Sequence, residues 1–327
     1  MLSSGGVPDP LPLPAFRRRR GTVRLLTLDG IHVCIQEGMT GRPQTYELAG
    51  RTVNRIGFGA MQLPGPHVWG PPKDRDQAIA VLRRAVELGV NHIDTAQYYG
   101  PDVSNELIRA ALHPYPDDLV LATKVGALRD AEGGWPPALS PDELIAAVHD
   151  NLTALGIERI DVVNLRIPDV GTEIPLAELI GPLQQLKDEG KIGGIGISTV
   201  PLALYREAAG LTDVAQVQNL YSVANRGSAD VVAETGADGV PFVPYFPLGA
   251  AWTNDNVLGN PVVSEIAGTR GITAAQVALA WTLAQGDHVL LIPGTSSIDH
   301  LEENLAVAEI ELDADEIERL DGAAQAR

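Results

Sequence analysis

Three side chains at the ends of two short, strand-like runs are of types that together can move a proton. Asp94 lies in the run at residues 92–96, Tyr99 follows it, and Lys124 lies near the end of the run at 119–125. If both runs are neighbouring parallel strands, these side chains leave the sheet at the same edge. A tyrosine beside a cation can act as a proton donor whose acidity is tuned, and we expect Lys124 to lower the pKa of Tyr99.

Each of these residues also has a plain structural interpretation. Asp94 could cap a turn or helix, and Tyr99 could be an aromatic residue packed in an interface. Lys124 favours the catalytic interpretation over the structural one. A lysine that ends an apolar strand loses hydration and is tolerated when it is paired, here with Asp94. The three residues together therefore predict an acid site.

A regular alternation of strands and helices surrounds this candidate site. The pattern predicts a small hairpin at residues 46–53, followed by alternating strands and helices. Strands are expected at 55–61, 92–96, 119–125, 160–167, 192–198, 214–220, 241–246 and 289–293. Helices are expected at 76–88, 104–112, 140–155, 176–189, 201–209, 228–235, 261–270, 273–285, 298–307 and 313–324. Eight such units predict an α/β fold, a (β/α)₈ TIM barrel, in which the chemistry lies at the carboxyl ends of the strands.

Two helix starts in this pattern have specific signals. Ser140, Pro141 and Glu143 form a capping box with proline in the first turn, and Ser104 is the expected N-cap of the helix at 104–112. A doubly wound dinucleotide fold is the alternative architecture. It is disfavoured because the glycines at 57 and 59 lack the third glycine and the following helix of that motif.

Charge and composition narrow the possible partners. The 327-residue chain carries a formal charge of −18, and residues 1–38 hold five arginines and only three acids, so the remainder is more acidic still. Such a body repels phosphate backbones, which argues against nucleic-acid binding. We expect residues 1–43 to be an N-terminal extension without stable structure and residues 44–327 to form the barrel.

Cysteine content and apolar runs indicate the cellular compartment and whether the chain crosses a membrane. Cys34 is the single cysteine, so no intrachain disulfide can form, and no apolar run is long enough to span a membrane. The arginines at 17–20 resemble the start of an export signal, but residues 27–30 interrupt the apolar stretch that should follow. The sequence predicts a cytoplasmic protein, and no spacing of histidines predicts a metal site.

Short motifs in a fixed order make residues 44–325 resemble the aldo-keto reductases. They are the glycine pair 57–59, the run from Asp94 to Gly100, and further motifs at 105–106, 123–124, 196–198, 218–219, 245–249, 292–296 and 303–304. The resemblance implies reduction of a carbonyl group with hydride from NADPH, NADH not being excluded. It also implies that Tyr99 protonates the carbonyl oxygen while Asp94 and Lys124 tune it.

The resemblance further implies a set of cofactor-binding residues. Ser198 and Gln218 would hold the nicotinamide amide, with Thr199 and Asn219 beside them, and Tyr245 would stack on the nicotinamide ring. Contacts along the rest of the cofactor, including its adenine end, are implied for Pro247, Leu248, Gly249, Gly294, Thr295, Ser296, His300, Glu303 and Asn304.

The sequence departs from the family pattern in three respects. Arg166 stands where the family has a catalytic histidine, and arginine can orient or polarise a carbonyl but does not relay protons at neutral pH. A salt bridge at the barrel rim is the alternative role for Arg166. Gly294 and His300 replace the usual basic pair at the 2′-phosphate, so preference for NADPH depends on the family, and Thr199 replaces the usual asparagine.

The substrate is expected to be a small carbonyl compound. His67 and Trp69 in the loop after the first strand, and Trp252 after the seventh, are candidate pocket residues, although each could be an ordinary loop or packing residue. Motifs near residues 59–63, 68–72 and 163–166 resemble a bacterial branch of the family that includes pyridoxal reductases, in which arginine at the histidine position is normal. Reduction of pyridoxal to pyridoxine is thus the leading expectation.

Two other functions remain open from the sequence. A non-catalytic NAD(P)-binding redox sensor would explain Arg166 but not the complete set of Asp94, Tyr99 and Lys124. A phosphate-handling barrel isomerase would explain the glycine-rich turn at 294–296 but not Tyr99. The sequence does not indicate an oligomeric state.

Overall fold

Six parallel strands form the continuous part of the central sheet. The computed structural model describes residues 23–28, 31–36, 43–168, 172–250 and 255–323. Neighbouring strands follow one another in chain order and are all parallel. They are β5 (Phe58–Gly59), β6 (His92–Asp94), β7 (Val120–Val125), β8 (Ile160–Arg166), β9 (Ile192–Ser198) and β10 (Val214–Gln218).

Two further segments close this sheet into a barrel. Phe242 bridges Val217 of β10 on one side and Val289 on the other, and Leu291 then bridges Ile56 just before β5, all in parallel orientation. These segments occupy the places of the seventh and eighth predicted strands, so the (β/α)₈ barrel is confirmed. They pair through isolated bridges rather than continuous ladders, and the prolines at 241, 244 and 293 have no N–H to donate to a ladder.

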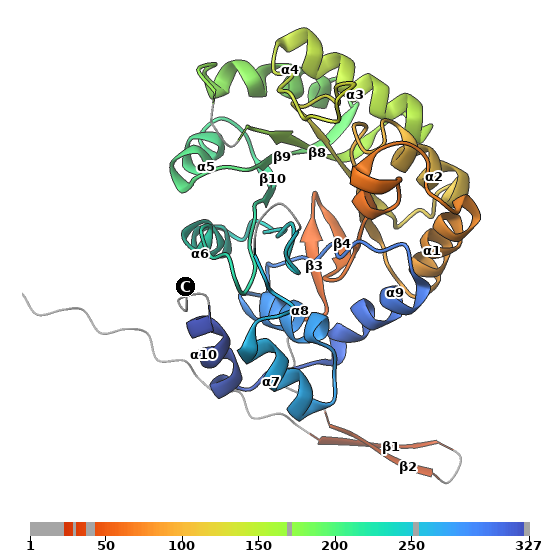
Figure 1. The fold of residues 1–327 in the computed structure, drawn as a ribbon, viewed down its shortest axis with the longest axis vertical. Helices are drawn as coiled ribbons and strands as arrows, with labels where there is room; N and C mark the ends of the chain where they lie inside the picture. The colour runs from red at the N-terminus through yellow and green to blue at the C-terminus, as the bar shows by residue number, and fades with distance from the viewer. Residues whose placement is uncertain (1–22, 29–30, 37–42, 169–171, 251–254, 324–327) are drawn as a thin grey trace, which may run out of the picture. The chain divides into compact units, whose positions relative to one another are not determined.

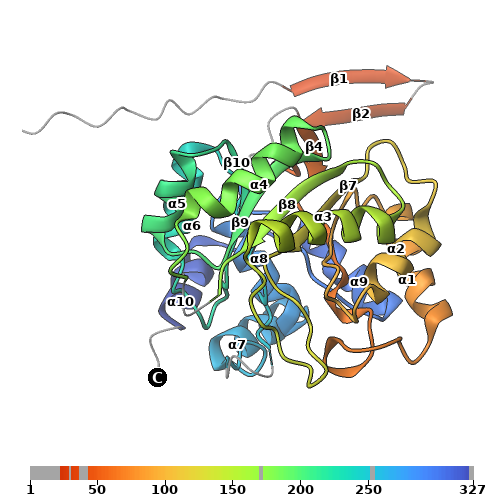
Figure 2. The ribbon, with the colours of Figure 1, turned by 90° about the horizontal axis from the view of Figure 1, so that it is seen from above.

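Helices surround the barrel, as Figure 1 shows in a view that looks into it. They are α1 (Arg75–Glu87), α2 (Val103–Leu112), α3 (Pro141–Leu155), α4 (Leu176–Asp188), α5 (Leu202–Ala209), α6 (Ala229–Asp238), α7 (Pro261–Arg270), α8 (Ala274–Ala284), α9 (Ile298–Leu305) and α10 (Ala314–Ala323). Consecutive helices α1 to α4 pack against one another along the outside (Figure 2).

The two predicted helix starts have different outcomes. At α3 the Ser140 side chain accepts from the Glu143 N–H while Glu143 accepts from the Ser140 N–H, so the capping box is confirmed. At α2 the cap position falls on Asp102, and the Ser104 hydroxyl instead donates 3.0 Å to the Ala60 carbonyl. Ser104 is therefore not a cap, and its hydroxyl ties α2 to the end of the first barrel strand.

A hairpin fills the amino-terminal end of the barrel. β3 (Thr45–Leu48) and β4 (Arg51–Asn54) pair antiparallel, as predicted, and lie across the middle of the view in Figure 1. Leu48 and Val53 are fully buried against inward-facing side chains of the strands, such as Val120 and Val162. The hairpin therefore closes one end of the barrel and leaves the opposite, carboxyl end for the site.

The segment before the barrel contains regular structure that the sequence analysis did not expect. β1 (Val23–Leu28) and β2 (Ile31–Gln36) pair antiparallel, with Val23 opposite Gln36 and Leu28 opposite Ile31. Contacts between Cα atoms separate residues 1–42 as one unit and residues 43–327 as another. Within β2, β-branched residues alternate with other residue types, a period of two that is typical of a strand.

No helix within the described part of the chain is both long and apolar enough to cross a membrane.

One histidine is enclosed at the amino-terminal end of β6. His92 is 2% exposed, and neither ring nitrogen has a hydrogen-bond partner among the described residues. Gly57 makes room for the ring, since a Cβ at position 57 would collide with it. Burial lowers the pKa of His92 to about 4, and the nearby backbone at Asn54 and Leu291 opposes this only in part.

This buried histidine predicts acid-sensitive folding. The unfolded chain binds a proton at His92 below about pH 6.5, whereas the folded chain binds it only below about pH 4. Folding stability should therefore decrease as the pH falls through this window, by about 3 kcal/mol for this group. Urea unfolding at a series of pH values should show a shallower dependence in His92→Asn than in the native chain. The matched variant His149→Asn, at an exposed position on α3, should keep the native slope; equal slopes for both variants would contradict the assignment.

Candidate active site

A cavity of about 1130 Å³ lies at the carboxyl ends of the barrel strands. Its wall includes most of the residues that the sequence predicted to act on substrate or cofactor. Those that line it are Asp94, Tyr99, Lys124, Arg166, Ser198, Thr199, Asn219, Tyr245, Pro247, Leu248, Gly249, Gly294 and His67. The size suits a dinucleotide end together with a small substrate.

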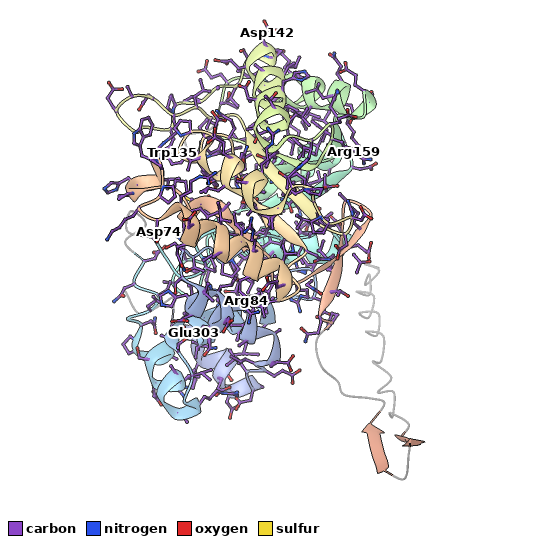
Figure 3. The ribbon with its side chains drawn as sticks, turned by 90° about the vertical axis from the view of Figure 1, so that its right-hand side faces the viewer. Asp74, Arg84, Trp135, Asp142, Arg159 and Glu303 are labelled. Carbon is purple, nitrogen blue, oxygen red and sulfur yellow. The ribbon has the colours of Figure 1, made fainter. Side chains whose placement is uncertain are left out.

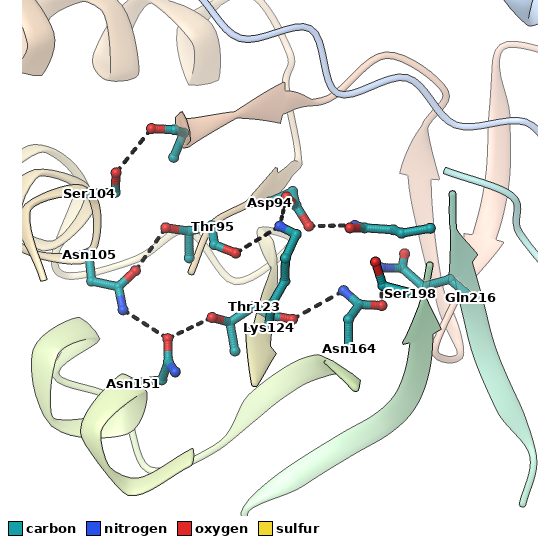
Figure 4. Close-up of polar contacts among 12 residues, drawn as sticks. Asp94, Thr95, Ser104, Asn105, Thr123, Lys124, Asn151, Asn164, Ser198 and Gln216 are labelled. Carbon is teal, nitrogen blue, oxygen red and sulfur yellow. Dashed lines mark hydrogen bonds and ion pairs between the residues drawn. The ribbon is translucent and has the colours of Figure 1, made fainter. Parts of the chain in front are cut away.

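A buried ion pair forms the floor of this cavity. Asp94 ends β6 and Lys124 lies near the end of the adjacent β7, and the Lys124 ammonium contacts the Asp94 carboxylate with both side chains almost fully buried. Lys124 Nζ also donates 3.0 Å to the Thr95 carbonyl, and Gln218 Nε2 donates 2.5 Å to the second oxygen of Asp94 (Figure 4). The pair is thereby held from three strands.

A chain of buried amides and hydroxyls supports the ion pair from behind. Thr95 Oγ1 donates 2.8 Å to Asn105, whose Nδ2 donates 2.9 Å to Asn151 Oδ1, and Thr123 Oγ1 donates 2.6 Å to the same oxygen. Figure 4 shows this chain running from β6 through α2 and α3 back to β7. Because Thr95 and Thr123 directly adjoin Asp94 and Lys124, the chain fixes the direction in which the pair points.

Tyr99 lies beside the ion pair with its ring almost fully buried. Lys124 Nζ is 5.1 Å from the centroid of the Tyr99 ring. The pKa of Tyr99 is raised well above the ordinary value, first by burial and then by the Asp94 carboxylate, while Arg166 opposes the shift. The expectation of a lowered pKa is therefore wrong in its net direction for the protein alone, because burial outweighs the charges that favour the phenolate. The phenol keeps its proton at neutral pH and is available as an acid.

Arg166 closes β8 and faces the same cavity. Its Cα pairs in register with Ser198 on β9, and the side chain is half-buried. No ion pair joins Arg166 to a carboxylate among residues 43–168, 172–250 and 255–323, so the structure does not support a salt bridge at the rim. The guanidinium carries N–H donors and no acceptor, so this part of the wall can offer hydrogen bonds to an oxygen bound in the cavity.

The residues expected around the nicotinamide have distinct roles. The hydroxyl of Thr199 lies 3.4 Å from Ser198 Oγ and 3.3 Å from Tyr245 Oη, and all three residues line the cavity. Asn219 also lines it, but its amide is used by the Val200 backbone, whose N–H donates to Oδ1 and whose carbonyl accepts from Nδ2. Gln218 is fully buried, its Oε1 has no partner among the described residues, and it supports Asp94 from outside the wall.

Residues expected at the far end of the cofactor lie outside the cavity wall, on the turn after Gly294 and on α9. Thr295 and Ser297 shape the turn, since Thr295 Oγ1 accepts from the Ser297 N–H and Ser297 Oγ accepts from the His300 N–H. The other residues expected at this end of the cofactor also lie outside the cavity wall: Ser296, His300, Glu303 and Asn304. Arg84 of α1 forms an ion pair with Glu302 of α9 at 2.7 Å. Figure 3 labels Arg84 and Glu303, the residue that follows Glu302.

The predicted substrate pocket is only partly as expected. His67 lines the cavity, whereas Trp69 is 41% exposed and lies outside its wall, and Trp252 falls outside the described residues. The wall also includes Tyr98, Arg129 and Trp135, none of which the sequence analysis selected. Figure 3 labels Trp135. Their place in the sequence could have indicated them. Arg129 and Trp135 lie in the loop after the strand that carries Lys124, and such loops build the site of a barrel.

Thr199 has a strained backbone. Its φ is 66°, in the left-handed region that β-branched residues avoid. The conformation is held by the Thr199 N–H, which donates 2.9 Å to the Gln218 carbonyl. It places the hydroxyl between Ser198 and Tyr245, so strain is stored where a nicotinamide would contact the protein.

This strain predicts a stabilising substitution. Thr199→Asn should raise the free energy of unfolding by about 1 kcal/mol, because asparagine tolerates the left-handed region better than threonine does. Urea unfolding should show a higher midpoint with an unchanged slope. Thr153→Asn, on the regular helix α3, serves as the matched control and should not stabilise. Equal midpoints for the two variants would show that Thr199 is not strained.

Comparisons with known proteins agree with this geometry. Residues 55–325 match the model of the aldo/keto reductase family. The chain is 44% identical over 285 residues to pyridoxine 4-dehydrogenase of Escherichia coli (strain K12), covering 85% of this chain and 97% of that protein.

Solved structures of similar proteins lead to the same family. An aldo/keto reductase from Klebsiella pneumoniae in complex with NADP and acetate is 27% identical, with a TM-score of 0.70 over 85% of this chain and 94% of its own. A structure of an aldo-keto reductase from the same organism in complex with NADPH has a TM-score of 0.72 at 27% identity, over 86% and 95%. With a family model that spans nearly the whole barrel, and with an intact aspartate, tyrosine and lysine at its mouth, the chain belongs to the aldo/keto reductase family of NAD(P)H-dependent oxidoreductases.

Proposed function

We propose that this protein reduces a small aldehyde or ketone with NADPH, with Tyr99 as the proton donor, and that pyridoxal is its substrate. The observation that carries the proposal is the burial of Tyr99 beside the Asp94–Lys124 ion pair at the mouth of the barrel. A protonated phenol held against a cation is suited to protonate a carbonyl oxygen.

The side chains divide the work of this reaction. The cofactor, when bound, supplies the hydride. Tyr99 donates its proton to the carbonyl oxygen, and Lys124 stabilises the negative charge that the phenol oxygen then acquires. Asp94 keeps Lys124 in place, and Gln218 holds Asp94. Arg166 polarises the carbonyl through its N–H donors, a role that needs no proton transfer from the guanidinium.

The donor set fits a nicotinamide cofactor along one side of the cavity. Tyr245 offers a ring face, Ser198 and Thr199 offer hydroxyls, and Gly294 lies so close to Gly59 that a Cβ at position 294 would collide with the Gly59 carbonyl. His300 is the one basic residue within α9 (Ile298–Leu305). NADPH is proposed because solved relatives contain NADP or NADPH.

The similarity to pyridoxine 4-dehydrogenase supports pyridoxal as the substrate. Aromatic side chains on the substrate side of the cavity, Tyr98 and Trp135, are suited to pack against a pyridine ring. A cytoplasmic location also belongs to this proposal.

The assay that tests the proposal follows NADPH and NADH oxidation with pyridoxal and with simple aldehydes and ketones. Tyr99→Phe should lower turnover by about 100-fold or more, because it removes a positioned acid while it retains the ring. NADPH binding, measured by titration of the cofactor fluorescence, should be retained. Tyr115→Phe, which removes a hydroxyl that donates 2.7 Å to the Leu155 carbonyl away from the cavity, should keep its turnover. Full turnover in Tyr99→Phe would exclude the mechanism.

Arg166 distinguishes the reductase from a non-catalytic NAD(P)-binding sensor, the second candidate. If Arg166 is adapted to polarise this substrate, Arg166→His should reduce kcat/KM for pyridoxal by about tenfold or more, since charged donors form the stronger hydrogen bonds. A rise in activity would instead identify arginine as a defect in a catalytic site. Cofactor binding without turnover of any carbonyl in the native chain would favour the sensor.

A further inference from the structure

The substrate side of the cavity contains an aromatic and cationic cluster outside the catalytic set. Trp135 packs edge-on to Tyr98, with ring centroids 5.4 Å apart, and the Arg129 guanidinium lies 3.9 Å from the Trp135 centroid. All three residues line the cavity. Arg129 is anchored there, because its terminal nitrogens donate 2.7 Å to the His67 carbonyl and 2.5 Å to the Gly133 carbonyl.

Two polar atoms in this cluster have no partner. Tyr98 is 3% exposed, and its hydroxyl makes no hydrogen bond to any residue that the structure describes; the same holds for Nε of Arg129. Buried polar groups are normally paired, so unpaired donors beside a cavity indicate a ligand that completes them. The Tyr98 ring lies edge-on to the Tyr99 ring, with centroids 5.4 Å apart, so Tyr98 directly adjoins the catalytic set.

The charge of the cavity wall points to the kind of ligand. Lys124, Arg129 and Arg166 are its lysine and arginine side chains, while Asp94 is its single carboxylate among the described residues and is neutralised by Lys124. Asp130 acts on Arg129 from the same loop, but its carboxylate accepts from the Gly134 N–H at 2.5 Å and is not part of the wall. Two unneutralised guanidinium groups thus remain in a protein whose net charge is −18.

We propose that Tyr98, with Arg129, forms a subsite for an anionic oxygen on the substrate, separate from the carbonyl that is reduced beside Tyr99 and Arg166. The subsite takes an aromatic carbonyl compound that carries a carboxylate or phenolate, and its ring packs against Trp135. This proposal rests on the proposed reductase function and specifies its substrate class. Tyr98 is a specificity residue that donates its hydroxyl hydrogen; burial raises its pKa, so the hydroxyl remains protonated.

The first test compares two aldehydes of similar size, para-carboxybenzaldehyde and para-methylbenzaldehyde, with NADPH. The native enzyme should prefer the carboxylated aldehyde. Tyr98→Phe should lower the ratio of kcat/KM between the two by about tenfold, because a hydrogen bond to a charged group is lost. The change should appear mainly as a higher KM for the carboxylated aldehyde. Tyr115→Phe should keep the native ratio. A native enzyme without preference, or a ratio that Tyr98→Phe leaves unaltered, would overturn the proposal.

A second test does not require turnover. Benzoate and the neutral benzamide are titrated against the tryptophan fluorescence of the full chain, in which Trp135 lies in the proposed subsite. Benzoate should bind more tightly than benzamide, and Tyr98→Phe should remove most of the difference. Trp135→Phe should remove the fluorescence change. Equal binding of the two probes would overturn the subsite even if carbonyls are reduced, whereas selective benzoate binding without any carbonyl turnover would support the subsite and reject the reductase.

Discussion

The buried contact between Lys124 and Asp94 is the interaction on which the site depends. Each charge has left water, and each is tolerated only because the other lies against it and because Thr95 and Gln218 complete the remaining hydrogen bonds. Loss of either partner would strand a charge in the barrel at a cost of about 3–5 kcal/mol. The ion pair and its hydrogen bond from Gln218 therefore connect strands β6, β7 and β10. The same contacts determine the charge beside Tyr99.

Burial and the charge of Arg166 have opposite effects on the pKa of Tyr99. Burial and the Asp94 carboxylate raise the pKa of the phenol, and Arg166 counteracts this from β8. An acid of this kind stays protonated while idle and becomes a good donor only when a carbonyl oxygen develops negative charge beside it. Arg166 thus connects two features of the wall: it moderates the acid, and it contributes cationic charge to the substrate side.

The barrel provides this wall through local irregularities as much as through regular strands. Prolines lie in the last two strand positions, and those segments join the barrel through isolated bridges rather than continuous ladders. The left-handed backbone at Thr199 places a hydroxyl between Ser198 and Tyr245. The loop after β7 contributes Arg129 and Trp135. Repeated β/α units build the fold, and the residues that shape the site lie where the backbone departs from that repeat.

Periodicity and local chemistry determined much of this protein from the sequence alone. Alternating apolar runs and capping signals such as Ser140 and Glu143 specify strands and helices locally, and eight such units leave few arrangements other than a barrel. Asp94, Tyr99 and Lys124 could be found because strand ends of a barrel meet at one rim. The tertiary structure decided what depends on distant neighbours: the direction of the Tyr99 pKa shift, the structural use of Gln218 and Asn219, and the cluster of Tyr98, Arg129 and Trp135. Burial and contacts between loops arise only when the barrel closes, so local patterns in the sequence cannot predict them.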